Sequence, residues 1–342
     1  MNGVELRERR WRVSCWAVLS AGTMGAVGGA ASAQERTTIA PKWAPAEVRY
    51  IEITRDIEEH TRGSPLPSPA QTTYREIQTC RQVVEPADGD GGTMRLTFDR
   101  LMWKGDGITG GTVQFDTDVG EIVGAKDALG SILAAMVGKT FTIEFRPDLR
   151  IRSCRGMDAI RSAAAHRAID ATVFAAMEGE LTDEAAALLW GETRLMLYPP
   201  RRVRPWDSWA RELKVGHPYL GELKYDFGCS LDELTTREGR PVAVVRYQCL
   251  VTRSPDCKPG VQLSGVLTDQ VDGTIEGEAV FDVQGGLFVE QKDEAHVKLT
   301  LRAEAVPPAD PVTFTTDRTI RRTIRALTED ERARQRAEDR QP

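Results

Sequence analysis

The chain has 342 residues, of which 41% are hydrophobic, and its 45 basic and 51 acidic side chains give a net charge of -6. This length and composition are typical of a globular protein with a sizeable core, in one large domain or two ordinary ones. The acidic balance argues against nucleic acid and against anionic membrane surfaces as partners.

The first 33 residues are laid out like a secretory signal peptide. A basic start precedes an uncharged, apolar run over residues 13–30 and the small residues Ala31-Ser32-Ala33. The arginines of the basic start are Arg7, Arg9, Arg10 and Arg12. We therefore expect export to the periplasm or beyond, with cleavage after Ala33 and no integral membrane segment afterwards. An uncleaved anchor is the alternative, although the run is barely long enough to span a bilayer. The export route, general secretion or twin-arginine, stays open.

Six cysteines occur in the chain, and one of them, Cys15, precedes the predicted cleavage site. The odd number that remains leaves at least one thiol free or available to another chain. Cys249 and Cys257 flank a short loop, which favours a disulfide between them, and Cys229 is a rival partner for Cys249. Because no C-x-x-C pair or Cys/His cluster occurs, we predict no zinc or redox site.

The first half of the mature chain alternates apolar and polar residues with the two-residue period of half-buried strands. Strands are predicted over residues 48–57, 73–84, 93–103 and 112–115. A proline-rich break at residues 63–69 and a glycine-rich turn at residues 88–92 separate them. The aspartates of that turn lack the ligand spacing of a calcium loop.

Residues 125–137 form the clearest predicted helix, because one apolar stripe runs along them and Gly138 is placed for a left-handed cap. A hairpin at residues 140–154 follows. Two further helices are predicted between residues 156 and 191, the first with Asp158 and the second with Thr182 as N-cap.

The segment from residue 199 to residue 209 combines positive charge with aromatic rings. Its members are Arg201, Arg202, Arg204, Trp206 and Trp209. Such a patch can hold an anionic or sugar-like ligand by charge and stacking. The interpretation that we favour is a proline-stiffened linker whose tryptophans cover a sheet edge.

The strand pattern then recurs. A hairpin over residues 224–251 is followed by a strand that begins at residue 260, with Val261-Gln262 matching Val113-Gln114 of the first half. A tight turn at Asp272-Gly273 is expected where the first half has its helix. A second hairpin turns at residues 284–286, and a last strand covers residues 295–303.

These elements predict an α+β fold: two related, curved antiparallel β-sheet (meander) repeats with a central helical segment packed on them. The predicted divisions are a signal peptide (1–33), a first repeat with one helix (34–156), a helical insert (157–192), a second repeat (193–306) and a polar C-terminal tail (307–342). The charged end of that tail is expected to be a frayed helix or disordered.

Motifs for chemistry are missing from the sequence. There is no G-x-S-x-G turn or P-loop, and the histidines have no metal-ligand spacing. Acidic pairs such as Asp116/Asp118 are interpreted as the solvent side of strands. We therefore predict no catalytic, cofactor-binding or metal-binding residues and no cofactor, and we favour a protein that is not an enzyme.

The order of features from Tyr50 to Leu301 resembles a family of uncharacterised exported bacterial proteins, a domain of unknown function. The features are the strand and acidic turn near Val113, the helix before Gly138, the hairpin at Pro147, the Trp206–Trp209 segment and the Asp272-Gly273 run. This resemblance implies no activity and transfers no catalytic residue.

The functional hypothesis is an exported, non-enzymatic protein that binds a ligand or scaffolds the cell envelope. The alternatives are a periplasmic carrier of lipid or another hydrophobic ligand, with helices plugging an apolar concavity, and an envelope hydrolase of unfamiliar type. An apolar cavity favours the carrier. A histidine that meets a carboxylate in a cleft favours the enzyme. The ligand, the partner and the oligomeric state stay open.

Overall fold

The computed structural model describes residues 36–42, 48–63, 69–86, 91–106, 112–119, 128–217, 220–254, 266–303 and 312–339. The predicted signal peptide (1–33), most of the proline-rich break and glycine-rich turn, and the strand start at residue 260 lie outside these ranges. Every element below belongs to the unit formed by Arg36–Pro342. Among the described helices, none is both long and apolar enough to cross a membrane.

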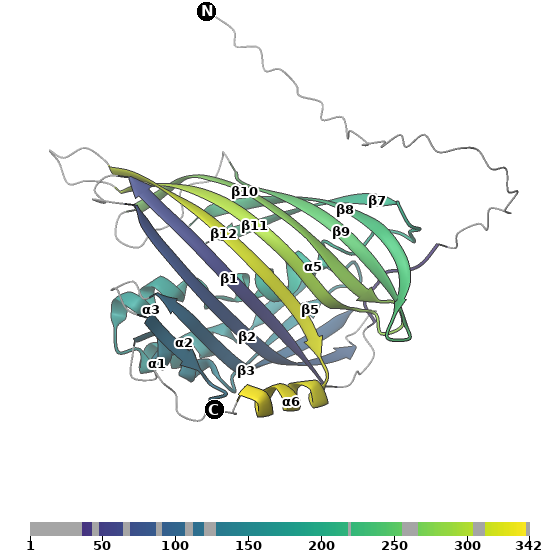
Figure 1. Cartoon of the computed structure of the whole chain (residues 1–342), viewed down its shortest axis with the longest axis horizontal. Helices are drawn as coiled ribbons and strands as arrows, with labels where there is room; N and C mark the ends of the chain where they lie inside the picture. Colours follow the sequence, from purple (N-terminus) through teal and green to yellow (C-terminus); the bar gives the residue numbers. More distant parts are fainter. Residues whose placement is uncertain are drawn as a thin grey trace, which may run out of the picture. The chain divides into compact units, whose positions relative to one another are not determined.

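One curved antiparallel sheet of twelve strands makes up most of the described structure (Figure 1). The strands are β1 (Arg49–Gly63), β2 (Ala70–Pro86), β3 (Gly92–Asp106), β4 (Thr112–Asp116), β5 (Thr140–Phe145), β6 (Ile151–Arg155), β7 (Ser208–His217), β8 (Gly221–Arg237), β9 (Arg240–Arg253), β10 (Val266–Asp282), β11 (Leu287–Ala303) and β12 (Val312–Leu327). Their order is β6-β5-β3-β2-β1-β12-β11-β10-β9-β8-β7, and β4 pairs with β3 off this path.

Most of the helices lie between β4 and β7 in the sequence. They are α1 (Ala128–Met136), α2 (Met157–Arg167), α3 (Ala171–Glu178), α4 (Asp183–Ala187), the π-helical turn η2 (Leu188–Glu192) and α5 (Thr193–Leu195). A last helix, α6 (Glu329–Asp339), follows β12 and lies across its end (Figure 1).

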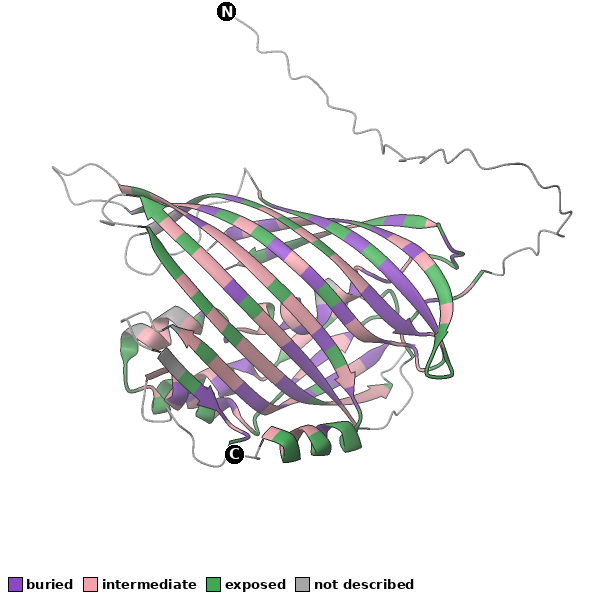
Figure 2. Cartoon of the chain, viewed as in Figure 1, coloured by how far each residue is buried: buried purple, intermediate pink, exposed green. Residues whose placement is uncertain are grey.

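The core forms where the helical segment 157–198 covers one face of the sheet, here called the inner face. Buried and exposed residues alternate along the strands (Figure 2), as expected when one face of a sheet is covered. Ile51 and Ile53 of β1 are on the inner face, and each is only 1% exposed. Two aromatic contacts join helical segment and sheet: the ring centroids of Phe141 and Trp190 are 6.2 Å apart, and those of Tyr198 and Phe288 are 4.9 Å apart.

The predicted antiparallel, β-rich architecture is confirmed. The helix before Gly138 is confirmed over residues 128–136, with Gly138 in the left-handed region at φ 76°. Thr182 is the N-cap of α4, because its Oγ1 accepts a hydrogen bond of 3.1 Å from the amide of Ala185. The expectation of two separate sheets is wrong, since β1 and β12 pair and join both halves of the chain into one sheet.

The predicted turn at Asp272-Gly273 is wrong, because both residues lie inside the continuous strand β10. Gly273 has a packing role instead. A Cβ atom there would lie 3.2 Å from Cβ of Val251 and 3.3 Å from Cγ2 of Val297, so a larger residue would crowd the neighbouring strands.

The N-cap assigned to Asp158 is also wrong. Gly156 is the N-cap of α2, at φ 114°, and Asp158 lies in the first turn. The first of the two helices predicted between residues 156 and 191 is divided into α2 and α3.

The region predicted as a polar C-terminal tail contains β12 and α6. Two of the arginines that make β12 look polar, Arg318 and Arg322, are paired across the sheet. Arg318 contacts Glu59 of β1 at 2.5 Å, and Arg322 contacts Asp293 of β11 at 2.7 Å. A strand that carries paired charges on a covered face does not show the apolar alternation on which strand prediction depends.

Candidate ligand-binding site

A pocket of about 100 Å³ opens where the helical segment meets the sheet. Strands β1, β2, β3 and β5, the turn η2, helix α5 and the β10–β11 hairpin all contribute to it. The residues that line it, together called the arginine pocket, are Pro41, Lys42, Arg49, Gln82, Val84, Met94, Phe145, Trp190, Gly191, Arg194, Leu195, Tyr198, Gly285, Gly286, Leu287 and Phe288.

The walls of the arginine pocket are largely apolar. Trp190, Tyr198 and Phe288 are 3%, 6% and 2% exposed. The π-helical turn that carries Trp190 is a geometry found often at functional sites. It also lies close to the sheet, because a Cβ atom at Gly191 would be 2.7 Å from Cδ1 of Ile151.

The N-terminal segment of residues 36–42 closes one side of the pocket. The amide of Lys42 donates a 3.2 Å hydrogen bond to the carbonyl of Gly286, and its Nζ donates one of 2.6 Å to the carbonyl of Gln284. Gly286 has φ 71°, and a Cβ atom there would lie 2.5 Å from Cγ of Lys42. The hairpin therefore needs glycine at this position for the N-terminal segment to lie against it.

Arg194 of α5 is one of the three charged side chains that line the pocket, with Lys42 and Arg49. It is half-buried, and its Nη2 donates a 3.0 Å hydrogen bond to the carbonyl of Phe288. Burial lowers the pKa of Arg194, and the nearby cation Arg322 lowers it further, while Tyr198 opposes them. None of the described acidic side chains forms an ion pair with Arg194.

The middle of the inner face holds a polar cluster whose charges are paired with one another. Tyr247 Oη donates a 2.5 Å hydrogen bond to Asp293 Oδ2, and Gln291 Nε2 donates one of 2.8 Å to Tyr247 Oη. Arg322 Nη2 contacts the same carboxylate at 2.7 Å. Burial raises the pKa of Tyr247, and the neighbouring Asp293 raises it further. Because each charge has a partner within the protein, we interpret this cluster as structural.

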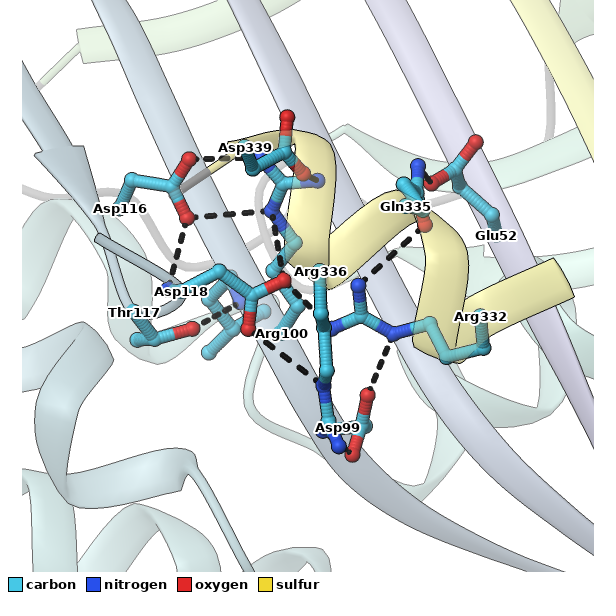
Figure 3. A network of polar contacts seen from close by, with 11 residues as sticks. Glu52, Asp99, Arg100, Asp116, Thr117, Asp118, Arg332, Gln335, Arg336 and Asp339 are labelled. Atoms are coloured by element: carbon cyan, nitrogen blue, oxygen red, sulfur yellow. Dashed lines mark hydrogen bonds and ion pairs between the residues drawn. The ribbon is translucent and has the colours of Figure 1, made fainter. Parts of the chain in front are cut away.

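A second polar network holds α6 against the face of the sheet opposite the inner face, here called the outer face (Figure 3). Arg332, only 1% exposed, contacts Asp99 at 2.7 Å and Asp118 at 2.6 Å. Arg100 contacts Asp116 at 2.6 Å and Asp339 at 2.7 Å.

The acidic pair Asp116/Asp118 is therefore buried, and its interpretation as the solvent side of a strand is wrong. Gln335 adds a neutral contact, since its Nε2 donates a 2.6 Å hydrogen bond to Glu52. The network attaches α6 to the sheet, and the charges within the network pair with one another.

The predicted charged and aromatic patch is divided by the fold. Trp209 is 8% exposed and lies on β7, whereas Trp206 is 78% exposed. The arginines of the patch, Arg201, Arg202 and Arg204, are exposed. Arg202 Nε donates a 3.2 Å hydrogen bond to Thr38, and Arg204 Nε contacts Asp207 at 3.5 Å. Trp209 therefore belongs to the core, and ligand binding by the exposed part stays a prediction.

The predicted disulfide also stays a prediction. Cys249 and its rival partner Cys229 are both buried and are not joined to each other, and Cys257 lies outside the described residues. Burial raises the pKa of Cys249 to about 12, with the nearby Asp226 and Cys229 adding to the shift.

Two histidines meet a carboxylate, but in exposed positions. His60 contacts Glu58 at 2.9 Å, and His296 contacts Glu294 at 3.0 Å. Each pair lies two residues apart on one strand. Across the ranges that the structure describes, no group of three or more His, Cys, Asp or Glu side chains is arranged to hold a metal ion.

The residues of the arginine pocket were missed by the sequence analysis. The signal that could have found Arg194 is its position, because it lies, after Glu192 and Thr193, in the mostly apolar run of residues 186–198. Lys42 and Arg49 have no such signal, since the fold alone brings them to the pocket.

Comparison with known proteins gives a family but no activity. A search of the curated proteins found no match. One solved structure, described as lipid-protein interactions in lipovitellin, aligns with a TM-score of 0.37 and 10% identity, over 82% of this chain and 25% of that chain. At this TM-score the similarity supports no conclusion about the present chain. A family model matches residues 91–287, which confirms the predicted resemblance to a family without an assigned activity. The chain belongs to the family of unknown function DUF6263.

Proposed function

We propose that this protein is an exported, non-enzymatic binding protein that holds the apolar part of a small molecule in the arginine pocket. The observation that carries the proposal is an open pocket with walls of buried aromatic and aliphatic side chains, placed between the helical segment and the sheet. Pockets of this kind are where small molecules usually bind.

The close packing of the backbone around the pocket supports the proposal. Gly191 and Gly286 both sit in close contacts that a larger residue would disturb. A bound apolar group would be shielded from water by the aromatic and aliphatic walls.

Carriage of a lipid or another hydrophobic ligand in the cell envelope is the role that we propose for this binding. The signal-like segment 1–33 supports export. We retain the division into related repeats (34–156 and 193–306) around a helical insert as part of the proposal. It is supported by the order of hairpins on the two sides of the insert.

The test uses the mature protein, residues 34–342. Native mass spectrometry before and after organic extraction should reveal a bound small molecule. The methyl ester of cis-parinaric acid, a neutral fluorescent probe with a single chain, should bind the extracted protein with a rise in fluorescence. Val84 lies at the pocket, so Val84→Phe should weaken probe binding at least tenfold. Leu250→Phe, at a position that is 53% exposed and away from the pocket, is the matched control and should bind as the wild type does. Failure of the extracted wild type to bind the probe, or equal binding by Val84→Phe, would contradict the proposal.

A further inference from the structure

We propose that the ligand of the arginine pocket carries a single anionic head group, a carboxylate or a phosphate, and that Arg194 binds it. This inference rests on the proposed function and adds the chemical class of the ligand. Three observations support the proposal. They are the sign of the charges around the pocket, the cation at its wall that has no described acidic partner, and the size of the enclosed space.

The charges at the pocket are all of one sign. Lys42, Arg49 and Arg194 line it, and none of its described lining residues is acidic. The protein as a whole has the opposite balance, with more acidic than basic side chains. A positive pocket in an acidic protein attracts an anion locally while the rest of the surface repels it.

Arg194 differs from other arginines that the fold covers. Arg55 contacts Glu76 at 2.5 Å, Arg100 contacts Asp116 at 2.6 Å, and Arg322 contacts Asp293 at 2.7 Å. Arg194 has no such acidic partner among the described residues. Its guanidinium donates a hydrogen bond to the backbone carbonyl of Phe288 instead. A covered cation without an anion is costly.

The geometry of the guanidinium suits a carboxylate or a phosphate. The hydrogen bond from Nη2 to the carbonyl of Phe288 leaves other N–H groups of the planar guanidinium free to donate. Two such N–H groups match the two oxygens of one carboxylate or phosphate. Lys42 uses one of its donors on Gln284 and is exposed beside the same pocket. We therefore assign the direct contact to Arg194, and to Lys42 and Arg49 the role of favouring negative charge at the opening.

The volume limits the part of the ligand that is enclosed. About 100 Å³ is smaller than the cavity of roughly 150 Å³ that takes up benzene in a protein core. The pocket therefore has room for the head group and a few carbons, next to Trp190 and Leu195. A single-chain amphiphile fits this description better than a bulky polycyclic molecule.

The experiment compares ligands that share one chain. Decanoate, decyl phosphate, decanol and decyltrimethylammonium are titrated against mature protein loaded with the neutral single-chain probe, the methyl ester of cis-parinaric acid. We expect decanoate, decyl phosphate or both to displace the probe at concentrations at least tenfold lower than decanol, and the cationic analogue to be the weakest. The tighter of the two anions identifies the head group.

Variants assign the effect to one side chain. Arg194→Met should remove the advantage of the anions while the affinities for decanol and for the probe stay within threefold. Arg194→Lys should restore part of the advantage. Arg334→Met, which removes an exposed arginine on α6, should change neither.

Two results separate this inference from the proposed function. If decanol and the anions displace the bound probe equally well, the anionic head group is wrong while binding of apolar groups stands. If the wild type binds neither the probe nor any decyl compound, the proposed function itself fails. Should Arg194→Met not fold, as judged by circular dichroism, the wild-type series of four ligands still decides the charge preference.

Discussion

Replacement of Arg332 by methionine should release helix α6 from the sheet. The side chain of Arg332 is 1% exposed and contacts Asp99 at 2.7 Å and Asp118 at 2.6 Å. Methionine keeps an unbranched apolar stem but removes both contacts. Arg334→Met is the matched control, because Arg334 is exposed on the same helix.

The size of the effect follows from the partners that remain. Removing one member of a buried ion pair costs about 3–5 kcal/mol, because the other charge stays buried without compensation. Here the loss is limited, because α6 can detach and return Asp99 and Asp118 to water. We expect the free energy of α6 opening to fall by about 3 kcal/mol, which corresponds to about a hundredfold in the opening equilibrium.

Hydrogen exchange measures this opening directly. An isolated helix of 11 residues is marginal in water, so protection of the amides of α6 depends on its docking to the sheet. In Arg332→Met, peptides from residues 329–339 should exchange about a hundredfold faster, while peptides from β10 and β11 keep their rates. Arg334→Met should stay within threefold of the wild type. Unchanged protection of α6 in Arg332→Met would refute the role given to the ionic network.

Three further predictions concern stability. Tyr247→Phe should lower the free energy of unfolding by about 1–2 kcal/mol in urea titrations, because the hydroxyl bonds the buried carboxylate of Asp293. An unchanged urea midpoint would show that this bond is dispensable. Phe281→Ala should cost about 3–5 kcal/mol, because the ring is fully buried in the core. Glu331 accepts hydrogen bonds from the amide and hydroxyl of Thr328, and the amide in particular lowers its pKa below the usual 4.5. Its stabilising effect is therefore present above the unfolded-state pKa and is lost as the pH falls through the folded value. Glu331→Gln should accordingly lower stability more at pH 6 than at pH 3, and an equal loss at both would contradict this assignment.

The fold was predictable wherever one face of a strand is apolar. Leu96 and Phe98 of β3 face the core, and Arg95 and Thr97 alternate with them, so the two-residue period was visible in the sequence. Strand β12 was missed because Arg318 points to the covered side of the sheet, where Glu59 neutralises it. An ion pair between residues 259 positions apart in the chain leaves no local signal.

The site was less predictable than the fold. Arg194 lies in a mostly apolar run, but Lys42 and Arg49 lie about 150 residues earlier. The pairing of β1 with β2 and β12 brings Arg49 to the pocket, and hydrogen bonds to Gln284 and Gly286 hold Lys42 there. The aromatic patch that attracted notice in the sequence is divided between surface and core, since Trp206 is exposed and Trp209 is buried.

Photo-crosslinking tests the central claim most directly. Mature protein is irradiated with an alkyl probe that carries a diazirine, and the labelled peptides are identified by mass spectrometry, with and without an excess of decanoate. Binding in the arginine pocket predicts labels on residues 188–198 and 284–288, and a loss of these labels when decanoate competes. Labels that scatter over the outer face of the sheet, or that decanoate leaves unchanged, would show that the pocket is not where this protein holds its ligand.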